Sequence, residues 1–205
     1  MNLEEHYSKK SNSIFLFGGA FDPIHNGHIQ IAKEIFQKFM PLEFFFIPSN
    51  NPPHKNIITP YKNRVEMLEL ALNKQSPFKI SYIENNNKKN NYAIDYVLYF
   101  KKLYPKKKIN LVLGFDSFLD LPNWYKFDDL LATANFYVIN RLGENQNKWC
   151  SSPNLLKKNI HFIENINLDI SSEDIRRKIK SKSNIKSSCT KKVIEYIQKH
   201  NLYGY

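Results

Sequence analysis

Short apolar runs alternate along this chain with segments whose apolar residues recur at helical spacing. An apolar run bounded by turn residues is typical of a strand buried on both faces, and alternation of such strands with helices is typical of a parallel sheet. We therefore expect an α/β fold, a doubly wound parallel sheet covered by helices on both faces, with a small helical portion at the C-terminus. The expected strands lie near Ile14–Phe17, Phe44–Ile47, Lys79–Ile83, Asn110–Leu113 and Phe136–Ile139, and the expected helices near His28–Phe39, Tyr61–Leu72, Tyr92–Leu103, Phe127–Ala132 and Ser171–Lys180.

Length and composition predict one globular domain. The chain has 205 residues, of which 42% are hydrophobic and 14% aromatic, enough to bury a substantial core. Residues 14–205 are expected to form the single domain. The segment Met1–Ser13 lacks apolar periodicity and is expected to be a loose extension.

Charge, cysteine content and hydropathy limit the partners. The net charge of +11 suits polyanionic ligands, nucleic acid or a lysine-rich proteome, and these three explanations stay open. Cys150 and Cys189 stand outside any CxxC pattern, which argues against a disulfide framework or a zinc site. The sequence has neither the apolar core of a signal peptide nor an apolar run of membrane-spanning length, so we expect a cytoplasmic protein without a membrane partner. Homo-oligomer formation is left open.

The most specific local feature is Gly18–His28 (GGAFDPIHNGH), which follows the first expected strand. Gly18 and Gly19 let the backbone turn sharply and approach a ligand without a Cβ in the way. If a helix begins near Gly27, His25 and His28 face one side of the loop, because they are three residues apart. Imidazoles and N–H groups at a helix start are suited to binding phosphate. The alternative is an irregular loop with two surface histidines.

A second candidate phosphate site opens the last expected helix. Ser171 and Asp174 have a loose capping-box spacing, and the two serines could serve only as helix caps. Serine hydroxyls and helix N–H groups can also bind phosphate oxygens, and Arg176 supplies a fork-shaped cation. Because loops after parallel strands meet at one edge of the sheet, we expect the segments after the first, second and fourth strands, Gly18–His28, Pro48–Lys55 and Gly114–Asp116, to converge there.

The histidine stretch resembles the GGxFDPxHxGH signature of the HxGH nucleotidyltransferase superfamily, whose members transfer AMP or CMP from a nucleoside triphosphate to a phosphorylated acceptor. Within it the chain is most similar to the bacterial nicotinate-mononucleotide adenylyltransferase family, from about Ile14 to Tyr203. The supporting segments are Pro52–Lys55 (PPHK), Asn91–Asp95 (NYAID), Leu113–Ser117 (LGFDS), Leu121–Tyr125 (LPNWY) and Ile170–Arg176 (ISSEDIR).

This resemblance implies a Rossmann-like fold of the nucleotidyltransferase type and transfer of AMP from ATP to nicotinate mononucleotide, with deamido-NAD and pyrophosphate as products. It implies catalytic roles for His25, His28 and Arg176. The residues it implies in ATP binding are Gly18, Gly19, Ala20, Phe21, His25, His28, Gly114, Ser171, Ser172, Ile175 and Arg176. The residues it implies in acceptor binding are His54, Lys55, Ala93, Asp116, Trp124, Tyr125 and Arg141. Mg²⁺ is expected as the cofactor, bound mainly through ATP phosphates without a metal cage of protein ligands.

Some of these residues have simpler explanations, and some depart from the family pattern. Lys55 could be a solvated surface charge, and Trp124 could anchor its loop. Glu173 stands where the family has threonine, so no role is transferred to it. Ala20 lacks the hydroxyl that is frequent there. Ala93 replaces a threonine, and this change bears on the choice between acid and amide acceptors.

Other functions are weighed against this one. The closest alternative is adenylyl or cytidylyl transfer to another phosphorylated acceptor, such as nicotinamide mononucleotide or phosphopantetheine. A nucleic-acid-binding protein would explain the charge, but Lys106–Lys108 and Lys191–Lys192 are scattered and lack an aromatic ribonucleoprotein pattern. NAD-dependent oxidoreduction is disfavoured because the first turn lacks GxGxxG.

Overall fold

The computed structural model describes residues 11–51, 57, 59–73, 76–86, 92–139, 159–163 and 170–205. Six strands of these residues form one sheet in the order β3-β2-β1-β4-β5-β6. Their bounds are β1 Ser11–Gly19, β2 Pro41–Pro48, β3 Phe78–Ile80, β4 Lys108–Gly114, β5 Asn135–Ile139 and β6 Ile160–Ile163. The α/β class and the doubly wound sheet predicted from the sequence are confirmed.

Every neighbouring pair of strands is parallel, and the strand order reverses between β1 and β4. Phe17 of β1 lies opposite Val112 of β4, so Gly19 and Gly114, each two residues further on, end their strands at the same edge. In open α/β sheets, ligands bind at the carboxyl ends of strands where the order reverses. The sheet therefore directs attention to the loops after β1 and β4.

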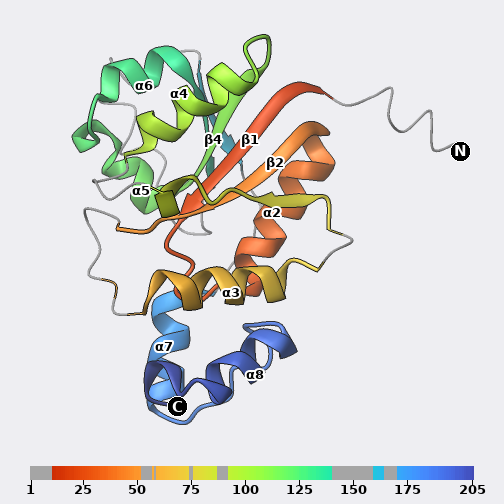
Figure 1. The fold of residues 1–205 in the computed structure, drawn as a ribbon, viewed down its shortest axis with the longest axis vertical. Coiled ribbons are helices and arrows are strands. Elements are labelled where there is room, and N and C mark those ends of the chain that lie inside the picture. The colour runs from red at the N-terminus through yellow and green to blue at the C-terminus, as the bar shows by residue number, and fades with distance from the viewer. Residues whose placement is uncertain are drawn as a thin grey trace, which may run out of the picture.

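Helices cover both faces of the sheet. Figure 1 shows α4 (Ala93–Leu103), α5 (Phe115–Leu119) and α6 (Phe127–Thr133) on one side of the strands, and α2 (Asn26–Phe39) and α3 (Tyr61–Ala71) on the other. The C-terminal helices α7 (Ser172–Lys180) and α8 (Lys191–Lys199) lie beyond α3. Short 3₁₀ turns, η1 (Ile83–Asn86), η2 (Leu121–Asn123) and η4 (Leu202–Gly204), complete the described elements.

The alternation of side chains along β1 divides the core into two clusters. Phe15 and Phe17 pack in the cluster shared with α2, α3, α7 and α8, whereas Ile14 and Leu16 pack in the cluster shared with α4, α5 and α6. Successive strand residues point to opposite faces, which explains why this run is apolar without interruption. Full burial of each such side chain contributes about 1.5–3 kcal/mol to stability.

Most predicted elements are confirmed, with shifted ends. Strand β1 begins at Ser11, within the segment expected to be loose, because Ser13 and Ile14 pair with Lys108 and Ile109 of β4. Residues 1–10 lie outside the described part of the chain. The strand expected over Lys79–Ile83 is wrong at its end: pairing with β2 stops at Ile80 and Ile83 opens η1.

Three elements were not predicted. Helix α5 has only five residues, too short for helical periodicity to be visible. Strand β6 has four residues and pairs with β5 at the sheet edge. Helix α8 repeats Val193 and Ile197 at helical spacing, a signal that the sequence does contain. Among the described helices, none combines the length and the apolar character that a membrane crossing requires.

Candidate active site

The histidine turn joins the carboxyl end of β1 to α2. Helix α2 begins at Asn26 with His25 as its N-cap, two residues before the expected start at His28. The imidazole rings of His25 and His28 stack with centroids 3.6 Å apart, which confirms that both lie on one side of the loop. His25 is 6% exposed and His28 is partly buried, so the pair is held by the fold.

The hydrogen bonding of the pair has a consequence for His28. The backbone N–H of His25 donates to Nδ1 of His28 at 3.3 Å. A neutral imidazole that accepts at Nδ1 carries its proton on Nε2, so Nε2–H is the group that could donate to a phosphoryl oxygen. The ring also packs edge-on against Phe21, with centroids 5.1 Å apart, which limits its rotation.

The two glycines of the turn are required for side-chain packing and not for a left-handed backbone. Neither has a positive φ, whereas Phe21 does, at 49°. A Cβ on Gly18 would lie 2.9 Å from the hydroxyl oxygen of Tyr96, and a Cβ on Gly19 would lie 3.1 Å from the Phe21 ring. The space left by the missing Cβ of Gly18, which was expected to admit a ligand, is therefore filled by the buried Tyr96 of α4.

The C-terminal segment binds the same turn. Ser172 donates from its hydroxyl to the Pro23 carbonyl at 3.0 Å, and Nη1 of Arg176 donates to the Asp22 carbonyl at 2.7 Å. The structure thus brings Ser172 and Arg176 beside the histidine turn. Glu173, to which no role was given, is exposed.

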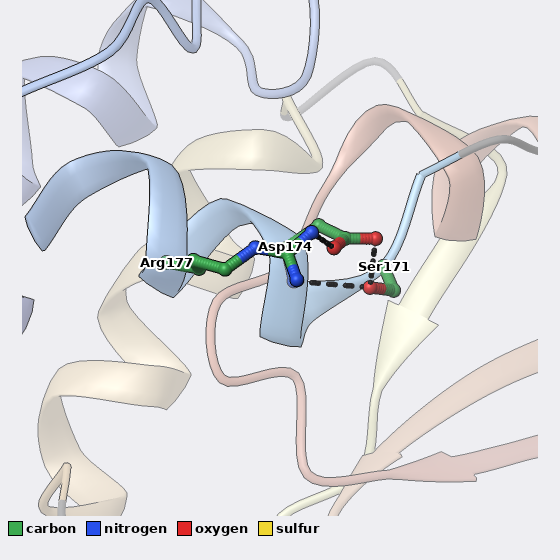
Figure 2. A network of polar contacts seen from close by, with 3 residues as sticks. All are labelled: Ser171, Asp174 and Arg177. Carbon is green, nitrogen blue, oxygen red and sulfur yellow. Dashed lines mark hydrogen bonds and ion pairs between the residues drawn. The ribbon is translucent and has the colours of Figure 1, made fainter. Parts of the chain in front are cut away.

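Ser171 caps α7. Its hydroxyl oxygen accepts from the Asp174 N–H at 3.0 Å, which is the N-cap bond that the capping-box spacing predicted. The same hydroxyl donates to the Asp174 carboxylate at 2.8 Å, and that carboxylate pairs with Arg177 at 2.5 Å (Figure 2). Ile175, also predicted at the ATP site, has its side chain in the core and donates its N–H to the Ser171 carbonyl at 3.1 Å.

Two residues predicted to bind the acceptor, Ala93 and Tyr125, lie at the N-terminus of α4. Ala93 is its first residue, and the ring of the preceding Tyr92 lies 4.5 Å from that of Tyr125. Trp124 follows η2 and is partly buried against the core, so it is held in place. Asp116 is exposed in the first turn of α5, directly after Gly114 and β4. Ala93 therefore lies at the start of α4, and Asp116, Trp124 and Tyr125 lie in the segment after β4.

A cavity of about 620 Å³ runs along α4 and reaches its N-terminus. Its lining includes Glu84, Tyr92 and Tyr96, but its described lining residues do not include His28 or Arg176. We locate the candidate chemistry at the histidine turn and not in this cavity, because the turn alone combines paired imidazoles, a guanidinium and a helix start.

Three predicted acceptor residues, His54, Lys55 and Arg141, lie outside the described residues. Cys189 is a free, buried cysteine whose thiol lies 3.5 Å from the Ile24 carbonyl oxygen, and burial raises the pKa of its thiol to about 12. Among the described residues, no three His, Cys, Asp or Glu side chains gather as a metal cluster would.

Two residues that hold the turn were missed. Arg64 of α3 is buried, and the hydroxyl of Tyr203 donates to the Asp22 carboxylate at 2.6 Å. Arg64 had a detectable signal, since it lies on the apolar stripe with Tyr61, Val65 and Leu68. A charged residue on such a stripe indicates a buried polar contact. Tyr203 had no local signal.

Comparisons with known proteins agree with this architecture. The family described as cytidylyltransferase-like matches residues 16–178. A "probable nicotinate-nucleotide adenylyltransferase" of Clostridium tetani is 34% identical over 92% of this chain and 97% of its own length. One of Staphylococcus epidermidis is 32% identical over 95% of this chain and 98% of its own length.

Solved structures share the fold. The nicotinic acid mononucleotide adenylyltransferase of Plasmodium falciparum, complexed with NaAD, superposes with a TM-score of 0.81 at 22% identity, covering 94% of this chain and 98% of that one. A "putative nicotinate-nucleotide adenylyltransferase" of Vibrio parahaemolyticus superposes with a TM-score of 0.67 at 19% identity, covering 93% and 94%. From the family match and the sequence relatives together, this chain belongs to the cytidylyltransferase-like family and, within it, to the nicotinate-nucleotide adenylyltransferases.

Proposed function

We propose that this enzyme transfers AMP from ATP to nicotinate mononucleotide and so makes deamido-NAD and pyrophosphate, a step of NAD biosynthesis. The observation that carries the proposal is the stacked pair of His25 and His28 at the carboxyl end of β1, next to Arg176 from α7. Relatives that are more than 30% identical over nearly the whole chain support the same reaction. We also propose that the protein is cytoplasmic.

The reaction is an in-line displacement at phosphorus. An oxygen of the acceptor phosphate forms a bond to the α-phosphorus of ATP, and the bond from that phosphorus to the bridging oxygen breaks, so pyrophosphate leaves with the electron pair. No covalent enzyme intermediate is needed, because positioning and charge stabilisation can supply most of the rate.

The site residues have distinct roles in this proposal. His28, through Nε2–H, and His25 stabilise the charge of the transferring phosphoryl group. Arg176 gives one N–H to the Asp22 carbonyl, and its other donors bind the leaving pyrophosphate. The N–H groups at the start of α7, that of Ser172 included, bind the same phosphates. The Ser172 hydroxyl, which gives its proton to the Pro23 carbonyl, holds α7 against the turn.

The acceptor is bound in this proposal by residues other than those that bind ATP. Trp124 stacks on the nicotinate ring, and N–H groups near Ala93 and Tyr125 bind the nicotinate carboxylate. Asp116 bonds ribose hydroxyls, and Lys55 pairs with the acceptor phosphate.

Mg²⁺ is proposed as the metal, bound by triphosphate oxygens and water. Asp22 is the carboxylate nearest to the two histidines in sequence, yet it is 6% exposed and accepts the Tyr203 hydroxyl. It therefore suits the task of fixing the loop better than that of coordinating a metal. When bound, the ion neutralises charge on the triphosphate.

The test is release of pyrophosphate from ATP and Mg²⁺ with nicotinate mononucleotide, run beside nicotinamide mononucleotide and phosphopantetheine, with products identified by mass. We expect fastest turnover with nicotinate mononucleotide and deamido-NAD as the product. Faster turnover with either of the other acceptors would refute the substrate assignment and keep the reaction class. Turnover with none of the three would refute the acceptor class as a whole.

His28→Ala tests the catalytic group. Loss of one preorganised donor to the transition state should lower kcat by roughly 10²–10³-fold. The matched control is His200→Ala, which removes a histidine that stacks on Tyr196 at the end of α8, 4.2 Å between centroids. We expect the control to keep wild-type kcat, and a His28 variant as active as the control would contradict the proposed role.

A further inference from the structure

Arg64 is a buried cation beneath the histidine turn. It lies in α3 and is only 1% exposed. Its Nη1 donates to the Ala20 carbonyl at 2.6 Å, Nη2 to the Asn50 carbonyl at 3.3 Å, and Nε to the Thr59 carbonyl at 3.2 Å. Burial lowers the pKa of its guanidinium, an effect that the nearby Asp22 carboxylate opposes. The side chain thus joins three separate segments of backbone.

The bond to Ala20 fixes the orientation of the next N–H. The Ala20–Phe21 peptide is trans, and in a trans peptide the C=O and the N–H point in opposite directions. With the Ala20 carbonyl aimed at buried Arg64, the Phe21 N–H is directed to the opposite side of the peptide, away from Arg64. Gly18, Gly19 and Ala20 of this turn are partly exposed. In the same way the Gly19 carbonyl accepts from the Ser49 N–H at 2.9 Å, which orients the Ala20 N–H.

The bond to Asn50 extends this control to the loop after β2. The Asn50 carbonyl accepts from Arg64, and the Asn50 N–H donates to the Glu84 carboxylate at 2.8 Å. Asn50 is therefore held through both of its backbone groups. Because the same guanidinium holds Ala20, the Ala20 and Asn50 carbonyls are fixed relative to one another.

We propose that Arg64 is the positioning residue that aims the Phe21 N–H at the triphosphate of ATP and sets the distance between Ala20, after β1, and Asn50, after β2. It does not touch substrate. Its effect is transmitted through two peptide planes, and the proposal rests on the proposed function because it assumes ATP at the histidine turn.

Arg64→Lys separates the charge from the geometry. Lysine keeps the positive charge, but a single ammonium nitrogen cannot reach three carbonyls in a fixed fork. The matched control is Leu68→Ala, in the next turn of α3, which removes a fully buried side chain that belongs to the core and to none of these loops. It destabilises the same helix without changing the peptide planes.

The peptide itself can be observed. Ala20–Phe21 is the only Ala–Phe pair in the sequence, so protein labelled with ¹³C-carbonyl alanine and ¹⁵N-phenylalanine gives one carbonyl-selected amide signal. We expect this signal to shift when α,β-methylene-ATP is added to the wild-type protein. In Arg64→Lys the signal should already be displaced without ligand, and in Leu68→Ala it should stay near the wild-type position.

Calorimetric titration with α,β-methylene-ATP measures how much affinity the Arg64 substitution costs. Loss of one well-aimed N–H to a charged phosphate should weaken binding roughly 10- to 100-fold in Arg64→Lys, and Leu68→Ala should bind as the wild type does. Unchanged binding in Arg64→Lys would overturn the proposal. The proposal would also be overturned if saturating α,β-methylene-ATP did not shift the Phe21 signal of the wild-type protein. This result applies even if the Arg64→Lys variant fails to fold.

Steady-state kinetics distinguishes a positioning role from a general loss of stability. Arg64→Lys should lower kcat and raise the KM for ATP, whereas Leu68→Ala should lower the unfolding temperature with both constants unchanged. Failure of the wild-type enzyme to use nicotinate mononucleotide would refute the proposed function. The analogue-binding experiment would still decide the role of Arg64, because it needs no acceptor.

Discussion

At the residue scale, the histidine turn is shaped by side chains that press against its backbone. Gly18 lies beside the hydroxyl of Tyr96, a buried residue of α4, and Gly19 faces the ring of Phe21. Burial raises the pKa of the Tyr96 hydroxyl, so it stays protonated at every physiological pH. The turn is consequently packed and leaves little room for an added methyl group.

Gly18→Ala should therefore destabilise the enzyme through overpacking. The new Cβ would lie 2.9 Å from the Tyr96 hydroxyl oxygen, and we expect the free energy of unfolding to fall by about 1–3 kcal/mol. Gly18→Ala with Tyr96→Phe should recover most of this loss, since the nearest remaining ring atom is 3.6 Å away. Urea unfolding of both single variants and the double variant measures the coupling, and purely additive effects would contradict the clash.

At the scale of the element, the first two serines of the C-terminal motif have different tasks. Ser171 is the N-cap of α7 and bonds within the helix end, to Asp174. Ser172 bonds outward, from its hydroxyl to the Pro23 carbonyl of the histidine turn. The Ser171 hydroxyl thus stabilises the end of α7, whereas the Ser172 hydroxyl holds α7 against the histidine turn.

Substitution of each serine by alanine should separate these tasks. Ser171→Ala removes an N-cap and should lower the free energy of unfolding by about 1 kcal/mol. Ser172→Ala should raise the KM for ATP more than Ser171→Ala does, because it loosens α7 and Arg176 from the turn. Thermal unfolding and ATP titration of both variants test this, and a larger rise in KM for Ser171→Ala would reverse the assignment.

At the scale of the whole molecule, the last part of the chain completes a site that the first part begins. The hydroxyl of Tyr196 in α8 donates to Glu66 of α3 at 2.7 Å, and the Asn26 N–H at the start of α2 donates to the Ser188 carbonyl at 2.8 Å. Residues of α7 and α8 also share the core cluster of α2 and α3. The C-terminal helices therefore pack in the same core as α2 and α3.

Buried Glu84 should make the stability of this domain depend on pH. Glu84 is 3% exposed, and burial raises the pKa of its carboxyl from 4.5 to about 7, although the Asn50 N–H and Arg64 oppose the rise and Asp95 adds to it. Between pH 4.5 and about pH 7, Glu84 keeps its proton in the folded chain but has lost it in the unfolded chain. The stability that Glu84 contributes is therefore complete below pH 4.5 and falls as the pH rises towards 7, by about 3 kcal/mol in all.

Glu84→Gln should remove this dependence. We expect the wild type to lose about 2–3 kcal/mol of stability relative to the variant between pH 5 and pH 8, as measured by urea unfolding at several pH values. Glu195→Gln, which removes an exposed partner of Lys191, should show no such difference and serves as the control. A constant difference between wild type and Glu84→Gln across this range would contradict the titration of Glu84.

The α/β class, the parallel sheet and the position of the histidine turn could be predicted from the sequence. Buried strands and turn residues leave local patterns, so the runs at Ile14–Phe17 and Asn110–Leu113, the histidine turn and the Ser171 cap could all be predicted. What the histidines, serines and arginines do to substrates stays a prediction. Short elements such as α5 could not be predicted, because five residues carry too little periodicity.

The side chains that hold the turn in place can be identified only in the folded structure. Arg64 bonds Ala20 from 44 residues away, Arg176 bonds Asp22 from 154, and Tyr203 bonds Asp22 from 181. A local pattern shows that a residue is buried, but it does not show which distant carbonyl or carboxylate the residue meets. Those partners depend on how the helices pack across the sheet, and packing is a property of the whole chain.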